Sequence, residues 1–314
     1  MKVVAIAGGV GAGKFLRGLS RLARGSDLTV VVNTGDDISM HGLRICPDLD
    51  SVTYWLGDAM DRERGWGRRD ETFRATTELR AFDPDAAWFN LGDLDLATHL
   101  FRTRLLEDGT TLSDATARIA ARFGVEANIV PMSHDRVATR VVVERGGREI
   151  DLHFQEYWVR YGARDRIARI SFEGVTDAGP APEVLAALGR ADAIVLCPSN
   201  PVVSIGPILA VPGVRPALAA ARERVVGISP IVAGAPVAGM ADRVMPAAGL
   251  EVSAHGAADA HRDVLGSWVI DEADRDLAPK IEEALRLRVV VTDTIMVDDD
   301  AAERLAGAAL ATLR

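Results

Sequence analysis

Short apolar runs alternate with amphipathic stretches along most of the 314-residue chain. Val3–Ala7 and Leu28–Val32 are apolar runs that predict buried strands. Between them, Phe15, Leu16 and Leu19 share one face of a predicted helix. The unit spans about 30 residues, the size of two parallel strands joined by a helix. Further buried strands are predicted at Ala87–Leu91, Ala127–Val130, Ala193–Cys197, Val225–Ile228, Ser267–Ile270 and Val289–Val291, and helices at Pro182–Gly189, Val214–Arg222, Leu277–Leu287 and Ala301–Leu313.

This alternation predicts an α/β fold with a three-layer, Rossmann-like, mostly parallel sheet covered by helices on both faces. Two apolar runs, Arg140–Glu144 and Glu149–Phe154, flank a Gly-Gly turn and predict an antiparallel hairpin that extends the sheet. Residues 51–124 are mainly helical in pattern. We therefore expect a nucleotide-binding core from residues 1–50 and 125–314, with residues 51–124 as a small helical insertion around the strand at Ala87–Leu91.

Composition narrows the class of protein. The formal net charge is -9 and the pI about 5.2, which argues against a nucleic-acid partner. Cys46 and Cys197 form no CxxC pair, as expected of reduced thiols in a cytoplasmic protein. The sequence contains no apolar run of about 18 residues, so we expect no membrane span.

A glycine-rich loop follows the first predicted strand and opens the first predicted helix. Glycines in that place let the backbone approach a phosphate, and the helix N-terminus supplies free N–H groups. The loop nearly matches the Walker A pattern, but Phe15 stands where a Ser or Thr would bind Mg²⁺, which disfavours a P-loop NTPase. The alternative is a tight turn without a ligand. The candidate phosphate-binding residues are Gly8, Gly9, Gly11, Gly13 and Lys14.

Polar loops also follow the other predicted strands. Asp36 and Asp37 come after the second strand, and Asp48 and Asp50 follow within 15 residues, a spacing that suits Mg²⁺ or a ribose hydroxyl. Any one of these aspartates could instead be a cap or turn residue. In an open parallel sheet such loops share one edge, where ligands bind. The remaining candidates in these loops are Asn90, Asp93, His99, Ser199, Asn200 and Ser229.

The segments GGVGAGKFLRGL, NTGDD, HGLRICPDLDSV, GWGRRDETF, LGDLDLATHLFRT, LHFQEYW, PSNPVVSIGPIL and SPIVAGAPVAGMADRVMP together resemble the 2-phospho-L-lactate transferase family. The resemblance runs over nearly the whole chain in order. It implies a transferase of coenzyme F-420 biosynthesis. The donor would be a guanosine diphosphate ester of a three-carbon acid, the acceptor the deazaflavin Fo, the leaving group GMP and the cofactor Mg²⁺. Phospholactate, phosphoenolpyruvate and phosphoglycerate remain open as the acid, and a homodimer is implied.

The resemblance also implies roles for individual residues. Asp36 and Asp50 would hold Mg²⁺ or orient the Fo hydroxyl, and either could act as a general base. Two positions depart from the family pattern: Leu94 replaces an Arg, and Asn90 replaces a Lys of archaeal members. Lys14 could supply the missing positive charge. The implied donor contacts are Gly8, Gly9, Gly11, Gly13, Lys14, Ser199, Asn200 and Ser229, and the implied Fo contacts are Asp50, Trp66, Arg68, Asn90, Asp93 and His99.

Two other functions fit parts of the pattern. A related regulatory branch, the gluconeogenesis factors, shares the glycine-rich opening and binds nucleotide sugars. A P-loop kinase would have a similar phosphate-binding loop, but this chain lacks the Ser or Thr that such a loop requires. The PDLD, WGRR and LGDLDLATH segments favour the transferase.

Overall fold

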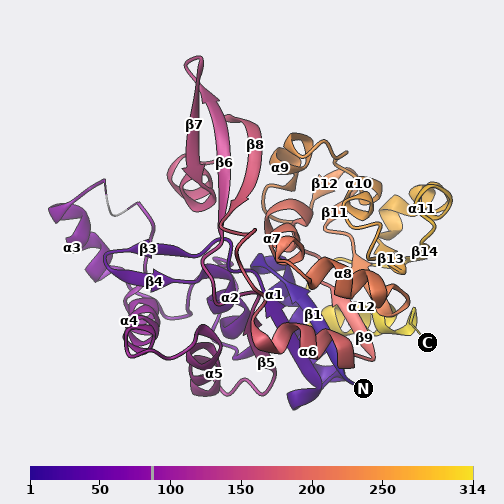
Figure 1. Cartoon of the computed structure of the whole chain (residues 1–314), viewed down its shortest axis with the longest axis horizontal. Coiled ribbons are helices and arrows are strands. Elements are labelled where there is room, and N and C mark those ends of the chain that lie inside the picture. The colour runs from indigo at the N-terminus through magenta and orange to yellow at the C-terminus, as the bar shows by residue number, and fades with distance from the viewer. Residues whose placement is uncertain (86–87, 314) are drawn as a thin grey trace.

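The computed structural model describes residues 1–85 and 88–313. Its centre is a seven-stranded, fully parallel sheet in the order β14-β13-β10-β9-β1-β2-β5 (Figure 1). β1 is an interior strand, and its Val3 is level with Leu28 of β2 on one side and with Ala193 of β9 on the other. The α/β, mostly parallel fold predicted from the sequence is confirmed. The strands are β1 (Val3–Ala7), β2 (Leu28–Val32), β5 (Asn128–Pro131), β9 (Ala193–Leu196), β10 (Val225–Ile228), β13 (Ser267–Ile270) and β14 (Arg288–Val291).

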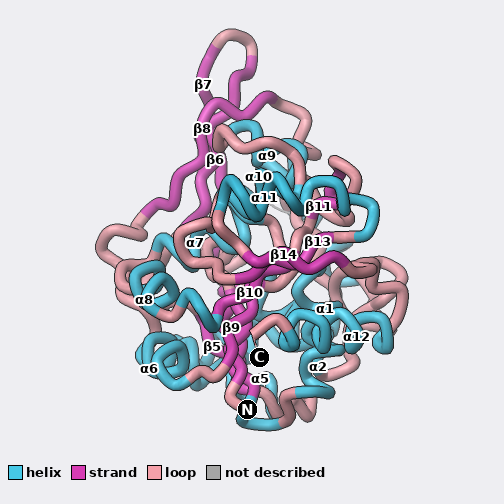
Figure 2. Tube along the Cα trace, turned by 90° about the vertical axis from the view of Figure 1, so that its right-hand side faces the viewer, coloured by secondary structure: helices cyan, strands magenta, loops and turns pink. Residues whose placement is uncertain are grey.

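Along each strand, the side chains point alternately into two separate hydrophobic cores, one on each face of the sheet. Val4 and Ile6 of β1 face one core, whereas Val3, Ala5 and Ala7 face the other. Helices cover both faces, as the turned view shows (Figure 2). The first core is closed by α6 (Pro182–Arg190), α7 (Gly206–Ala210), α8 (Val214–Ala220), α10 (Ala254–Asp259) and α11 (Ala278–Leu285), and the second by α1 (Gly9–Leu22), α2 (Pro47–Leu56), α5 (Leu112–Arg122) and α12 (Asp299–Ala311).

The strand predicted at Ala87–Leu91 is not formed. Ala87 lies outside the described residues, and residues 88–91 have no strand structure. Their apolar side chains pack instead in a small cluster against β3 (Ile38–Met40) and β4 (Leu43–Ile45), a two-stranded hairpin. The helices α3 (Arg74–Phe82) and α4 (Asp93–Glu107) flank this segment. The division into a core and an insertion stays a prediction.

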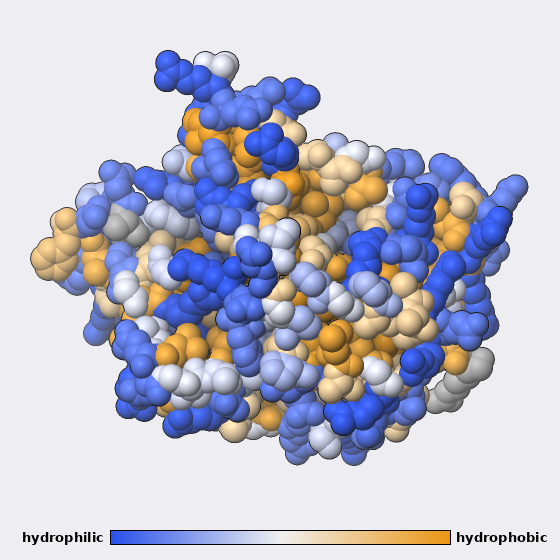
Figure 3. Space-filling view, in the orientation of Figure 1, coloured by the Kyte–Doolittle hydropathy of each residue, from blue (hydrophilic) through white to orange (hydrophobic). Residues whose placement is uncertain are grey.

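The predicted hairpin is present, but it belongs to a separate sheet and does not extend the large one. β6 (Ala138–Arg145) pairs with β7 (Arg148–His153) and also with a third strand, β8 (Arg166–Glu173). This three-stranded sheet projects from the body of the molecule (Figure 1). Its tip is hydrophilic and apolar side chains lie lower on it (Figure 3). Its inner face packs on α9 (Ala241–Ala247), and a second small hairpin joins β11 (Ile231–Val232) to β12 (Ala235–Pro236).

In the described parts of the chain, no single helix is long and apolar enough to cross a membrane, although the bent pair Pro201–Ala210 and Val214–Ala220 meets that test together.

Candidate functional site

The order of the strands reverses between β1 and β9. From β1 the chain builds outward through β2 and β5, and from β9 it builds in the other direction through β10, β13 and β14. In open parallel sheets, ligands bind outside the carboxyl ends of the strands at such a reversal. The loops after Ala7 and Leu196 are therefore the first place to seek a site.

The glycine-rich loop lies at this point and begins α1. Gly9 has a left-handed φ of 74°, which favours glycine, and its N–H donates to Asp48 Oδ1 at 2.9 Å. Gly11 and Gly13 are required by packing: an added Cβ would lie 2.5 Å from the Pro198 carbonyl oxygen or 2.1 Å from Trp55 Cδ1. A Cβ on Gly8 would lie 2.8 Å from Ser204 Cβ. The phosphate-binding role of these glycines stays a prediction, beside this structural reason for them.

The other residues predicted to contact the donor substrate differ in whether their polar groups are already engaged within the protein. Lys14 is exposed and forms no ion pair within the described chain. Ser199 is buried and its hydroxyl has no hydrogen-bond partner among the described residues. By contrast, Asn200 Oδ1 accepts the N–H groups of Val202 and Val203 and caps a π-helical turn. Ser229 Oγ is likewise engaged, donating to the Ile231 carbonyl oxygen at 2.8 Å.

Buried carboxylates gather beside the glycine-rich loop. Asp48 accepts from Asn33 Nδ2 at 2.9 Å as well as from Gly9, yet burial raises its pKa to about 6. Burial, and then the negative charge of Asp48, raise the pKa of Asp36 well above its ordinary value. Gln155 Nε2 donates to Asp36 Oδ2 at 3.4 Å, while Oδ1 has no partner within the part of the chain described. This free, buried oxygen beside a second carboxylate is suited to a cation.

Asp37 lies next to this pair but is already neutralised. Burial raises its pKa to about 6, and the guanidinium of Arg44, 3.0 Å away, opposes that rise. Thr34, in the same turn, is buried with an unpartnered hydroxyl. The turn after β2 therefore offers Thr34 and Asp36 to a ligand, whereas Asp37 is paired with Arg44 through Oδ2 and only its Oδ1 lacks a partner among the described residues.

Asp50, two residues after Asp48 in the first turn of α2, belongs to a second buried cluster. Its carboxylate accepts a two-pronged hydrogen bond from Arg102 of α4. His99 Nδ1 lies 3.6 Å from Asp50 Oδ2, and His99 Nε2 lies 3.4 Å from Asp95 Oδ2. The Tyr54 hydroxyl contacts Asp95 Oδ1 at 2.5 Å. Asp50 and His99, both predicted acceptor contacts, are thus brought together.

Asn90 and Asp93 instead join α3 to α4. Asp93 accepts the N–H groups of Arg74 and Ala75, the first turn of α3, and the Thr72 hydroxyl; that hydroxyl and the Ala75 N–H are the main causes that lower its pKa. Asn90 Oδ1 accepts from Arg80. These contacts occupy the side chains in local structure. Their predicted role at the acceptor stays a prediction.

Trp66 and Arg68 lie on the loop between α2 and α3. Trp66 packs against Phe73 with ring centroids 6.0 Å apart, and its side chain is 40% exposed. Arg68 lies over the ring of Phe123 at 5.1 Å and donates to the Leu94 carbonyl oxygen at 3.0 Å. The loop therefore presents a partly exposed indole.

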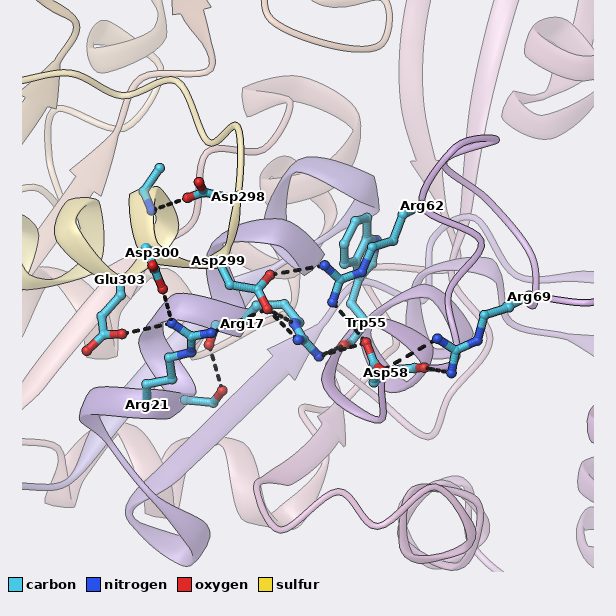
Figure 4. A network of polar contacts seen from close by, with 12 residues as sticks. Arg17, Arg21, Trp55, Asp58, Arg62, Arg69, Asp298, Asp299, Asp300 and Glu303 are labelled. Carbon is cyan, nitrogen blue, oxygen red and sulfur yellow. Dashed lines mark hydrogen bonds and ion pairs between the residues drawn. The ribbon is translucent and has the colours of Figure 1, made fainter.

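Ion pairs fasten the start of this loop to the first and last helices. Asp58 contacts Arg17, Arg62 and Arg69, and Asp299 at the beginning of α12 contacts Arg17 and Arg62 (Figure 4). Arg17 also donates to the Trp55 carbonyl oxygen at 3.2 Å. The network connects α1, the end of α2, the loop and α12.

The two buried clusters of carboxylates, one around Asp36 and one around Asp50, differ in how well they suit a metal ion. The candidate ligand atoms of Asp50, Asp95 and His99 lie within 4.8 Å of one another. However, Arg102 already neutralises Asp50, and a histidine nitrogen suits Mg²⁺ less well than oxygen does. Asp36 fits Mg²⁺ better because it has a free buried oxygen and an acidic neighbour in Asp48.

Sequence reasoning missed three contributors to this region: Asn33, Gln155 and Arg102. Each stands inside a motif used for the family resemblance, namely NTGDD, LHFQEYW and LGDLDLATHLFRT. Their partners lie 15 to 119 residues away in the chain, so only the fold reveals the contacts.

Known proteins resemble the chain over its full length. The family model described as 2-phospho-L-lactate transferase CofD matches residues 3–307. A protein of Streptomyces griseus named phosphoenolpyruvate transferase is 48% identical over 312 residues, covering 99% of this chain and 98% of its own length. One of the same name from Thermobifida fusca is 45% identical over 321 residues, covering 99% and 97%.

A solved structure supports the fold alone. The X-ray structure of protein BH3568 from Bacillus halodurans has a TM-score of 0.65 at 17% identity and covers 98% of this chain and 99% of its own. The full-length family match decides between the functions considered from the sequence, and it does not favour the regulatory alternative. The chain belongs to the 2-phospho-L-lactate transferase family and is a transferase of coenzyme F-420 biosynthesis.

Proposed function

We propose that this transferase moves a phosphoenolpyruvyl group from a guanosine diphosphate ester to the terminal hydroxyl of Fo and releases GMP. The observation that carries the choice of acid is the 45–48% identity, over 99% of the chain, to relatives named phosphoenolpyruvate transferase. A 2-phospho-L-lactyl group is the second candidate, because the matching family model has that name.

In this proposal the donor lies at the reversal between β1 and β9. The Gly8–Gly13 segment and the exposed Lys14 would face its diphosphate. The unpartnered hydroxyls of Thr34 and Ser199 are available as donors to phosphate or guanosine oxygens. Such groups orient the donor, and phosphoryl transfer depends mainly on orientation and charge stabilisation.

Asp36 and Asp48 would hold the Mg²⁺ in this proposal. When bound, the ion neutralises negative charge on the diphosphate and polarises the phosphorus under attack. Asp36 would contribute its free oxygen, and Gln155 and Asn33 would orient the two carboxylates.

Asp50 would receive the acceptor. Its carboxylate would accept a hydrogen bond from the Fo hydroxyl and could remove the proton as the oxygen attacks phosphorus. The exposed face of Trp66 is suited to stack on the flat deazaflavin. The bond from phosphorus to the bridging oxygen breaks, and GMP leaves.

Mass spectrometry of reactions with Fo and Mg²⁺ tests the proposal directly, with each of the three guanosine diphosphate esters supplied separately. We expect a phosphodiester of Fo, GMP in equal amount, and fastest turnover with the phosphoenolpyruvate ester. Asp36→Asn should abolish turnover, whereas Asp192→Asn, which changes a carboxylate bonded to the Lys2 N–H just before β9, should not. A folded wild-type protein that forms no Fo product from any ester would refute the proposal.

The homodimer remains a prediction. Light scattering coupled to size exclusion would test it, since a mass of 33.5 kDa identifies a monomer and twice that mass a dimer.

A further inference from the structure

Arg102 is an unusual side chain for the interior of a protein. It heads the fully buried side chains by volume in the described chain, with 1% exposure. Arginine is almost never fully buried unless it is paired. Its pairing with Asp50 is therefore the feature that needs an explanation.

The pairing fixes the Asp50 carboxylate in both position and plane. Arg102 Nη1 donates to Oδ2 at 3.1 Å, and Nη2 donates to Oδ1. A guanidinium fork that meets both carboxylate oxygens adds geometric restraint as well as energy. Without it, the terminal torsion of an aspartate is broad.

Arg102 is itself held from other sides. Nη1 lies 3.4 Å from the Arg44 carbonyl oxygen and 3.4 Å from His99 Nδ1. Asp95, His99 and Arg102 follow at spacings of four and three, so they share one face of α4. This face is directed at the first turn of α2, where Asp50 lies.

A purely structural role accounts poorly for this arrangement. Removing two charges from water costs free energy that can exceed the gain from their attraction, so a buried ion pair is weak evidence of a role in stability alone. A buried guanidinium that bonds both carboxylate oxygens fixes the orientation of a reacting group, which an apolar contact cannot do.

We propose that Arg102 is a positioning residue that holds the Asp50 carboxylate in one orientation for the acceptor alcohol. This inference rests on the proposed function, in which Asp50 receives the Fo hydroxyl. An ionised carboxylate has about four lone-pair sites, and the fork uses two. The remaining lone-pair sites of Asp50 can accept the proton of the alcohol while the alcohol oxygen aligns with the phosphorus.

The test compares Arg102→Lys with the wild type, because lysine keeps the charge but cannot form the fork. We expect kcat/KM for Fo to fall about 100-fold, as for a displaced reacting group, while the dissociation constant of the donor ester stays unchanged. Arg215→Lys is the control, since Arg215 of α8 also donates to both carboxylate oxygens of its partner, Asp263, in an exposed pair. It should leave both quantities unchanged.

A double-variant comparison separates positioning from simple loss of structure. If Arg102 acts through Asp50, adding Arg102→Lys to Asp50→Asn should reduce kcat/KM for Fo by less than threefold. A further 100-fold loss in that background, or wild-type kinetics in Arg102→Lys, would overturn the inference. So would an equal weakening of donor and acceptor binding.

If Arg102→Lys does not fold, Asp50→Asn and the neutral pair Asp50→Asn/Arg102→Gln supply the same comparison. Equal acceptor kinetics in these two variants supports positioning through Asp50, and a lower value in the pair overturns it. A wild-type protein that is folded but makes no Fo product refutes the proposed function, whereas an active wild type with unaltered Arg102→Lys kinetics refutes only the role of Arg102.

Discussion

Gly18 is the point of closest approach between α1 and α12, and replacing it with alanine should destabilise the protein. An added Cβ would lie 2.1 Å from the Ala302 carbonyl carbon and 2.3 Å from the Glu303 nitrogen. Carbon atoms in contact are about 3.5 Å apart, so the helices would have to separate by roughly 1.4 Å. The obstacle is backbone, which cannot turn aside as a side chain can.

Two opposing free energies set the size of the effect. Alanine favours helix over glycine by about 1 kcal/mol, and overpacking a core costs about 1–3 kcal/mol. Because α12 must move as a unit, we expect the upper part of that range and a net loss of about 2 kcal/mol in the free energy of unfolding. Urea unfolding followed by tryptophan fluorescence measures it.

Gly307→Ala is the matched control on α12 itself. Its added Cβ would meet only Leu22 Cδ1, at 3.9 Å, so the helix preference should act alone and stabilise the protein by about 0.5–1 kcal/mol. Opposite signs for the two variants are expected. If Gly18→Ala were as stable as the wild type, the close packing of α1 on α12 would be refuted.

Three further predictions concern titration and ligands. Burial lowers the pKa of His261 to about 4, so this histidine takes up a proton at higher pH in the unfolded chain than in the folded one, and the free energy of unfolding falls as the pH drops from about 6.5 to 4. His261→Leu should remove up to about 3 kcal/mol of this loss of stability. An unchanged dependence of urea unfolding on pH in the variant would contradict the prediction. Lys14→Ala should weaken the affinity for the donor ester about tenfold, measured by calorimetry, since one charged hydrogen bond is lost. Arg24→Ala, beyond the end of α1, should leave that affinity unchanged, and equal affinities of Lys14→Ala and the wild type would exclude a role for Lys14. Asp36→Asn should raise the melting temperature without metal, because it removes a buried carboxyl group whose ionised form is disfavoured by burial and by Asp48. It should also eliminate the further rise on adding Mg²⁺, and a Mg²⁺ effect equal to that of the wild type would place the ion elsewhere.

Strands buried on both faces could be predicted from sequence because their apolar runs are short and bounded by glycine or polar residues. The exception shows the limit of that signal. Trp88, Phe89 and Leu91 form an equally apolar run, but they pack against the β3–β4 hairpin and not in the sheet. A run of apolar residues records burial and does not say which surface buries it.

The third strand of the small sheet was missed for the opposite reason. β8 is mostly exposed, and Ile167 is the only one of its eight residues that is buried, so the strand lacks a clear alternation of buried and exposed positions. Its pairing with β6 is set by backbone hydrogen bonds, which leave little trace in side-chain chemistry.

The sequence predicted that acidic residues would gather in one region, but it did not predict which side chains they contact. Acidic residues after β2 and in α2 could be recognised as a cluster because they are close in sequence. That Asp50 is paired with Arg102 could not be predicted, since the two are 52 residues apart and meet only when α4 packs near α2. The same holds for the glycines, whose tight neighbours Pro198 and Trp55 come from other elements.

The ion-pair network between α1, the Asp58 loop and α12 has a consequence for biosynthesis. Asp299 is synthesised 282 residues after its partner Arg17. The interior strand β1 can pair along its second edge only when β9 has been made, about 190 residues later. Contacts of such long sequence separation form late and slow folding. While the chain emerges from the ribosome, the glycine-rich loop and the Trp66 loop therefore lack their support until the last helix has been synthesised. A chain truncated before α12 should be captured by chaperones or degraded, and it should not persist as a weakly active enzyme.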